Sequence, residues 1–275
     1  MRFAPMLAPV VPLVALLCAC SGEPQPAASR PAEAAAPAAA PSPPPVVPVP
    51  VPADARSVKE ENDLYEFEYS YPAAAASIPA LKALLDKDLD ARKAELLKMA
   101  KEGRAEAKKS DFPYNPYSRT VHWEVVTDLP GWLSMSTIVG EYFGGAHPNY
   151  VFETLLWDRT TNRRYDPADL FLSPAALDKA IRAPFCAEFD RQRAKKREGW
   201  EPSGEIPEFS GCIAPTEQTI ILGSSHGKAF NRIGVLVPPY AAGPYAEGDY
   251  DVTVPVTDAV LATVKPEYRP LFSVR

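Results

Sequence analysis

Residues 120–157, TVHWEVVTDLPGWLSMSTIVGEYFGGAHPNYVFETLLW, decide the fold of this chain. Three runs within them, 120–127, 132–143 and 150–157, are rich in the β-branched and aromatic residues that β-strands favour. Turn sequences separate the runs, first Leu129-Pro130-Gly131 and then residues 144–148, GGAHP. Because connections this short join antiparallel neighbours, the stretch predicts a three-stranded antiparallel meander.

Helical patterns flank this meander. Upstream, apolar residues recur at mostly helical intervals from Ile78 to Met99, starting beside Pro79 and ending near Gly103. Downstream, Ser173 suits the cap of a second helix, which carries Cys186. Further elements are expected as strands at 64–69, 219–222, 229–237 and 251–256 and a last helix at 257–264. The predicted fold class is α+β, with antiparallel sheets packed against two main helices.

The N-terminal segment predicts where in the cell the protein is located. An apolar run ends in Leu17-Cys18-Ala19-Cys20, which resembles the lipobox of bacterial lipoproteins and implies acylation of Cys20. The run is too short and too rich in proline for a membrane span of about 20 apolar residues. Plain secretion with cleavage after Ala19, or acylation of Cys18, is the alternative. By resemblance to Gram-negative sorting rules, Ser21 favours the periplasmic face of the outer membrane.

The sequence predicts three regions, a signal peptide at 1–19, a tether at 20–57 and an α+β domain at 58–275 with subregions about 60–160 and 165–272. The tether is mainly proline and alanine, which favours an extended polyproline II stalk of about 3.1 Å per residue. Such a composition cannot build a core, and we interpret the tether as an inert spacer.

The net charge restricts the classes of partner, and the two remaining cysteines indicate a disulfide. The formal net charge of −6 disfavours nucleic acid and allows a cationic partner. Cys186 and Cys212 form an even pair, which in an oxidising compartment is most simply a disulfide. Two buried thiols or a metal pair are the alternatives, although no CxxC spacing supports a metal. The basic run Arg191–Arg197 is interpreted as a solvated helix end rather than as a patch for anionic lipid or nucleic acid.

Two motifs carry a family resemblance. Residues 144–150, GGAHPNY, followed by 158–162 and 165–171, and residues 235–248, VLVPPYAAGPYAEG, resemble extracytoplasmic domains of unknown function. Together they are similar to the ectodomain of the lysozyme-binding anti-sigma factor and to the accessory region of some peptidoglycan deacetylases. The resemblance implies a binding domain. Deacetylase catalysis would need an Asp and paired His ligands, whereas the histidines here are widely separated at positions 122, 147 and 226.

The loop 238–250 is the predicted binding element. Tyr240, Tyr245 and Tyr250 offer rigid amphipathic surface, while Glu247 and Asp249 add negative charge suited to a cationic protein or a sugar amine. The alternative interpretation is structural, because tyrosines in an ordered loop often pack on the sheet beneath them.

The turn motif Gly144, Gly145 and His147 has two interpretations. Together with the flanking Glu141 and Glu153, the imidazole could transfer protons in a peptidoglycan-active hydrolase. The favoured interpretation is structural, with the glycines supplying positive φ and His147 bonding to the loop backbone.

We predict no catalytic residue, metal site or cofactor. The sequence thus predicts a lipid-anchored, non-catalytic binding module of the cell envelope. Its expected partners are the membrane, through the anchor, and a lysozyme-like cationic protein or peptidoglycan.

Overall fold

The computed structural model describes residues 55–197 and 209–275. The predicted signal peptide, most of the tether, and Cys18 and Cys20 lie outside the described residues. No helix within the described ranges is both long and apolar enough to cross a membrane.

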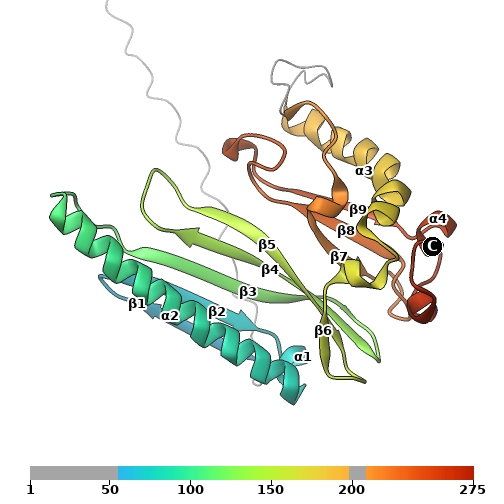
Figure 1. Cartoon of the computed structure of the whole chain (residues 1–275), viewed down its shortest axis with the longest axis horizontal. Helices are drawn as coiled ribbons and strands as arrows, with labels where there is room; N and C mark the ends of the chain where they lie inside the picture. Colours follow the sequence, from blue (N-terminus) through green and yellow to red (C-terminus); the bar gives the residue numbers. More distant parts are fainter. Residues whose placement is uncertain (1–54, 198–208) are drawn as a thin grey trace, which may run out of the picture. The chain divides into compact units, whose positions relative to one another are not determined.

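The described chain is α+β, as predicted, and contains two sheets and two long helices (Figure 1). The first sheet has the order β1 (Arg56–Glu61), β2 (Tyr65–Tyr71), β3 (Tyr117–Asp128), β4 (Trp132–Tyr142), β5 (Asn149–Asp158) and β6 (Arg163–Tyr165). The second sheet has the order β7 (Thr219–Gly223), β8 (Arg232–Val237) and β9 (Tyr250–Pro255). The α-helices are α1 (Ala73–Ala76), α2 (Pro79–Lys109), α3 (Pro174–Lys196) and α4 (Asp258–Leu261). Short 3-10 helices are η1 (Pro167–Leu170), η3 (Pro215–Glu217), η4 (Tyr245–Glu247) and η5 (Pro266–Leu271).

The predicted meander is present as β3, β4 and β5, paired antiparallel throughout. One pair of strands differs from the expected antiparallel pattern, because β2 and β3 run parallel. The long helix α2 connects them and supplies the crossover that parallel neighbours require. Figure 1 shows α2 lying along the first sheet.

The first core lies between α2 and this sheet. The helix buries Leu81, Leu85, Leu89 and Leu96 at helical spacing. Alternate residues of β2 meet them, namely Phe67, Tyr69 and Tyr71. The helix continues six residues past Gly103, where it was expected to fade. A Cβ on Gly103 would clash with the Tyr117 hydroxyl, so this glycine marks a close approach of helix and strand.

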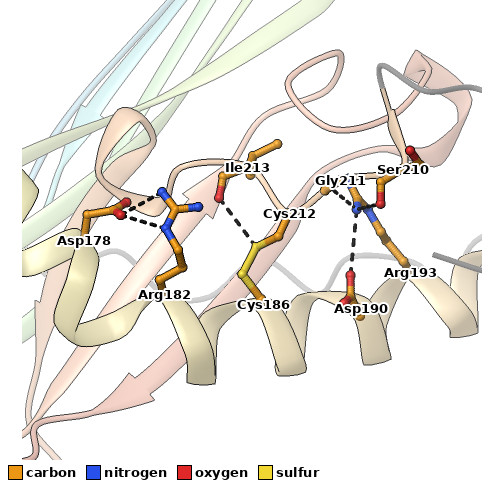
Figure 2. Close-up of a disulfide and its surroundings, with 9 residues drawn as sticks. All are labelled: Asp178, Arg182, Cys186, Asp190, Arg193, Ser210, Gly211, Cys212 and Ile213. Atoms are coloured by element: carbon orange, nitrogen blue, oxygen red, sulfur yellow. Dashed lines mark hydrogen bonds and ion pairs between the residues drawn. A yellow bond between two sulfur atoms is a disulfide. The ribbon is translucent and has the colours of Figure 1, made fainter. Parts of the chain in front are cut away.

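The second core lies between β7–β9 and α3. The Ser173 hydroxyl caps α3 by accepting a hydrogen bond from the Ala176 amide at 3.1 Å. Phe185 and Phe189 of α3 pack against the buried residues of β8 and β9. The predicted disulfide is present and joins Cys186 on α3 to Cys212 in the following loop, with 5.6 Å between their Cα atoms (Figure 2).

Candidate functional site

The two motifs singled out in the sequence meet in space. The His147 ring, in the turn between β4 and β5, stacks on Tyr245 with ring centroids 3.9 Å apart and planes at 21°. The Tyr240 hydroxyl lies 3.1 Å from Nε2 of the same histidine. The rings of Tyr240 and Tyr245 are 5.7 Å apart. We call His147, Tyr240 and Tyr245 the aromatic cluster.

Tyr240 is the most unusual member of this cluster. Its side chain is 50% exposed, and its φ of 68° is in the left-handed region, which aromatic residues rarely occupy. Such a conformation costs on the order of 1–3 kcal/mol and persists only where the surroundings impose it. A strained, exposed tyrosine is therefore a stronger indication of a functional surface than an exposed tyrosine in an ordinary loop.

The turn that carries His147 has the geometry its glycines allow. Gly144 has a φ of 85° and Gly145 a φ of 102°. Nδ1 of His147 lies 2.8 Å from the Pro148 carbonyl oxygen. Its two ring nitrogens thus contact its own turn and Tyr240, which fixes the ring plane against Tyr245.

The basic run at the end of α3 holds the loop 238–250. The expectation of a solvated helix end is met by the exposed Arg191 and Lys195, but it was wrong for Arg193 and Arg197, which turn toward this loop. The Arg197 guanidinium pairs with the Glu247 carboxylate and donates to the Ala242 carbonyl at 3.1 Å. Lys196 donates to the Glu247 carbonyl at 3.0 Å and lies 4.1 Å from the centre of the Tyr250 ring. These contacts fix the backbone on which Tyr240 and Tyr245 stand.

Arg193 extends this support into the interior. Its side chain is buried, lies 4.0 Å over the Phe189 ring, and donates to the carbonyls of Gly211 at 2.8 Å and Ala242 at 3.1 Å. Burial lowers the pKa of Arg193. Phe185, Phe189 and Arg193 are spaced four residues apart, so helical spacing was the available signal that this arginine faces the core.

The other predicted binding residues are engaged within the protein. Tyr250 is only 2% exposed, and its hydroxyl donates to the Glu247 carboxylate. The Tyr150 hydroxyl donates to the Asp249 carboxylate at 2.7 Å. Burial and then the acidic partner raise the pKa of both Tyr250 and Tyr150. The surface of this site is therefore aromatic, because its carboxylates already have partners.

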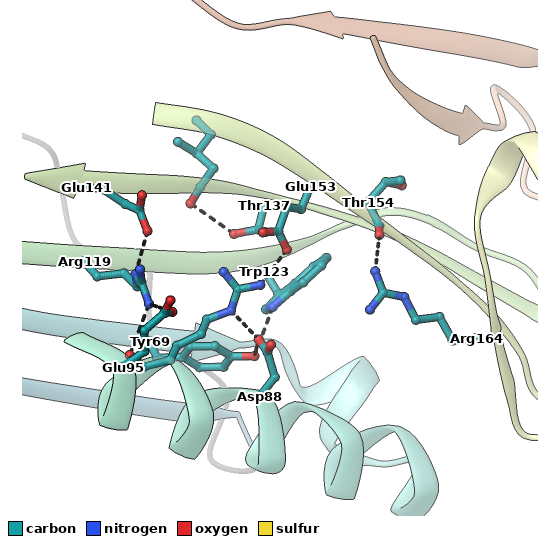
Figure 3. A network of polar contacts seen from close by, with 12 residues as sticks. Tyr69, Asp88, Glu95, Arg119, Trp123, Thr137, Glu141, Glu153, Thr154 and Arg164 are labelled. Atoms are coloured by element: carbon teal, nitrogen blue, oxygen red, sulfur yellow. Dashed lines mark hydrogen bonds and ion pairs between the residues drawn. The ribbon is translucent and has the colours of Figure 1, made fainter. Parts of the chain in front are cut away.

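The acid–imidazole–acid group suggested by the sequence does not assemble. Glu141 accepts from Arg119 at 2.7 Å (Figure 3). Glu153 accepts from Arg92 at 2.6 Å. His147 faces the aromatic cluster instead, and no hydrogen bond or ion pair joins the three side chains in the part of the chain that the structure describes. Nor do the described residues contain a group of three or more His, Cys, Asp or Glu side chains that could hold a metal ion.

Residues 58–150 match the family model of deacetylase PdaC. The predicted resemblance to peptidoglycan deacetylases is confirmed for this region, which runs from β1 to the start of β5. The match to PdaC is typical of an extracytoplasmic accessory domain of the cell envelope.

Two solved structures that match the chain are described as DUF3298 family proteins. One from Bacteroides fragilis is 20% identical, with a TM-score of 0.48, and the match covers 74% of this chain and 89% of that one. Another from Pseudomonas aeruginosa is 16% identical, with a TM-score of 0.47, and the match covers 82% of this chain and 99% of that one. No curated protein matches the chain.

Proposed function

We propose that this chain is a non-catalytic binding module of the cell envelope and that its ligand is a cationic protein of the lysozyme type. The observation that carries the proposal is the aromatic cluster, in which a strained, exposed Tyr240 stands on a loop that three basic residues hold in place. Rigid, exposed tyrosines dominate the binding energy of many protein interfaces because they bury much area at little entropic cost.

The charge of the chain supports a cationic partner. With a formal net charge of −6, the chain attracts a basic protein over long range and speeds their association. Contact would then be made through the aromatic cluster, because Glu247 and Asp249 are already paired with groups of the chain itself. Binding should therefore depend on salt mainly through its rate and on Tyr240 mainly through its lifetime.

We further propose that a lipid on Cys20 anchors the module at the periplasmic face of the outer membrane. The motif Leu17-Cys18-Ala19-Cys20 and Ser21 support this placement. A Cys20→Ser variant should then appear in the soluble periplasmic fraction, whereas the unaltered chain sediments with outer membranes. Equal distribution of the two proteins would contradict the anchor.

The ligand is tested by titration calorimetry with several lysozymes in low salt. Tyr240→Asn is the test variant. Asparagine tolerates left-handed φ, so this substitution removes the aromatic ring without adding backbone strain. Loss of an interface tyrosine should weaken binding by about tenfold or more. Phe112→Ala is the matched control, since Phe112 is an aromatic residue 70% exposed outside the aromatic cluster, and it should bind like the parent chain.

Three other results would change the conclusion. Absence of heat with every lysozyme at high micromolar concentration would contradict the proposed ligand. Binding of muropeptides alone would assign the aromatic cluster to wall glycan. Turnover of purified peptidoglycan that Glu153→Gln abolishes would instead support a hydrolase.

A further inference from the structure

The strand β5 has a free edge. It pairs with β4 over its whole length, from Asn149 to Asp158, but the short strand β6 covers only Leu156–Asp158. Residues 149–155 therefore have a strand neighbour on one side only within the described chain. An uncovered edge presents unpaired backbone groups to any extended chain that approaches it.

Two side-chain contacts show which residues face outward along this edge. The Phe152 carbonyl accepts from the Thr219 hydroxyl at 2.9 Å, and the Thr154 carbonyl accepts from Arg164 at 3.2 Å (Figure 3). Because the backbone groups of one residue point to the same side of a strand, the amides of Phe152 and Thr154 also point away from β4. No hydrogen bond to either outward amide is found within residues 55–197 and 209–275.

The sequence of this edge lacks the usual protection against added strands. Residues 149–155, NYVFETL, contain no proline and no lysine, the residues that commonly block exposed edges. Their single charge, Glu153, is paired with Arg92 on the face of the sheet toward α2. The outward amides of Phe152 and Thr154 are thus open to backbone pairing, whereas the outward carbonyls of the same residues already accept from Thr219 and Arg164.

A cleft lies beside the same residues and is acidic. It has a volume of about 570 Å³ and includes residues 151–154 in its lining. Its other walls carry three carboxylates against one cation, Arg164. Asp166 and Asp169 also accept from backbone amides at the start of η1, so Glu217 is the carboxylate without a partner among the described residues. The Glu217 side chain, on η3, is exposed and has no hydrogen bond or ion pair within the described residues. This charge balance disfavours an acidic occupant and complements a basic one.

We propose that this cleft binds an extended, cationic peptide segment that adds to β5 as a further strand. The outward amides of Phe152 and Thr154 donate to carbonyls of the peptide. Basic side chains of the peptide face Glu217, Asp166 and Asp169. Main-chain hydrogen bonds then supply affinity and charge supplies selectivity, as in other strand-addition complexes. The proposal is independent of the aromatic cluster and of the ligand assigned to it.

Peptide chemistry tests the proposal on the unaltered protein. The probe is a fluorescent seven-residue peptide of alternating lysine and valine, compared with its glutamate–valine counterpart and with two versions N-methylated at alternate backbone positions. The glutamate peptide should bind about tenfold more weakly or worse. At least one methylated peptide should lose binding, because its N-methyl groups keep one of its edges from approaching β5. Equal binding of all four peptides would overturn the proposal.

Protein variants locate the site. Thr154→Pro removes one outward amide at a position where an edge strand tolerates proline, and Thr154→Val is the matched control, since it keeps that amide while losing the same hydroxyl. Proline should abolish binding of the lysine peptide, valine should preserve it, and Glu217→Gln should weaken it. Unchanged affinity in both Thr154→Pro and Glu217→Gln would contradict the assignment.

Hydrogen exchange decides the question if Thr154→Pro does not fold. On addition of the lysine peptide to the unaltered protein, exchange should slow at the amides of Phe152 and Thr154. Unchanged exchange at both amides would exclude strand addition. Tyr240→Asn should leave peptide binding intact, so failure of the lysozyme experiment and failure of this one are separate results.

Discussion

At the scale of single residues, buried polar side chains determine how the helices attach to the sheets. Tyr69 is fully buried beneath α2, where its hydroxyl donates to Asp88 at 2.9 Å and accepts from Nε1 of Trp123 at 3.1 Å. Burial and then the Asp88 carboxylate raise the pKa of Tyr69. Folding therefore holds this phenol in its neutral form.

This shift predicts how stability changes in alkali. Because the folded-state pKa lies above the unfolded value of about 10, the contribution of Tyr69 is complete below that pH and falls above it by about 1.4 kcal/mol per pH unit. Tyr69→Phe loses both hydrogen bonds and should be less stable than the parent at pH 8. The gap should narrow between pH 10 and 11.5, as urea unfolding at several pH values can measure. A gap that stays constant with pH would contradict the assignment.

Arg193 is the residue on which the loop 238–250 most depends. Arg193→Lys should lower the free energy of unfolding by roughly 2 kcal/mol, because an ammonium cannot reach the carbonyls of both Gly211 and Ala242 and leaves buried acceptors unsatisfied. Arg191→Lys is the control, since this neighbouring side chain is exposed, and its effect should stay within about 0.5 kcal/mol. Equal effects of the two substitutions in urea unfolding would contradict the role given to Arg193.

The basic run also shows where prediction from sequence stops at this scale. Charge at the end of a helix is usually solvated, and nothing local distinguishes Arg191, which pairs with Glu188 on its own helix, from Arg197, which pairs with Glu247. The partner is fifty residues away in the chain. Likewise, Tyr240 and Tyr245 were predicted as surface residues, but their stacking with His147 depends on a long-range contact that no spacing reveals.

At the scale of elements, periodicity predicted most of the fold. Alternation in β2 and helical spacing in α2 and α3 depend on local pattern, and the structure has these elements where the pattern placed them. The strand β1, RSVKEE, was not expected, because its mostly polar edge sequence has little alternation. The parallel pairing of β2 with β3 was missed, although the long helix expected between these strands is the kind of crossover that parallel neighbours require.

The disulfide links two elements of the fold, and its effect on the free energy of unfolding can be measured. It joins α3 to the segment that Arg193 also binds, and it closes a loop of 26 residues. Replacing both Cys186 and Cys212 by alanine should lower the unfolding free energy by about 3 kcal/mol. Reduction of the parent chain should give a similar loss in urea unfolding, and an unchanged midpoint would contradict the prediction.

The disulfide and Arg193 should not act independently. Because both hold residues 210–212 against α3, their losses should be non-additive when the substitutions are combined. Additive losses in a double-mutant cycle would show that each one fixes the segment without the other.

At the scale of the whole described domain, the two cores share strands. Near the β4–β5 ends, Leu133 and Leu155 point into the core under α2, while Trp132 and Leu156 point into the core under α3. Both faces of the first sheet are thus buried at this end. Loss of one core would expose the strands that support the other, so the cores are expected to unfold together.

Calorimetry can test this coupling on the full chain. The parent should show one transition with a calorimetric enthalpy close to the van't Hoff enthalpy, which is the criterion for a single cooperative unit. Trp132→Ala should cost about 3–5 kcal/mol and broaden or split the transition, because it removes the largest side chain that β4 gives to the second core. Leu133→Ala should also destabilise but keep a single transition, since Leu133 belongs to the first core alone. Two transitions in the parent would mean that the shared strands do not couple the cores, and the loop bearing Tyr240 would then unfold without disturbing the PdaC-like region.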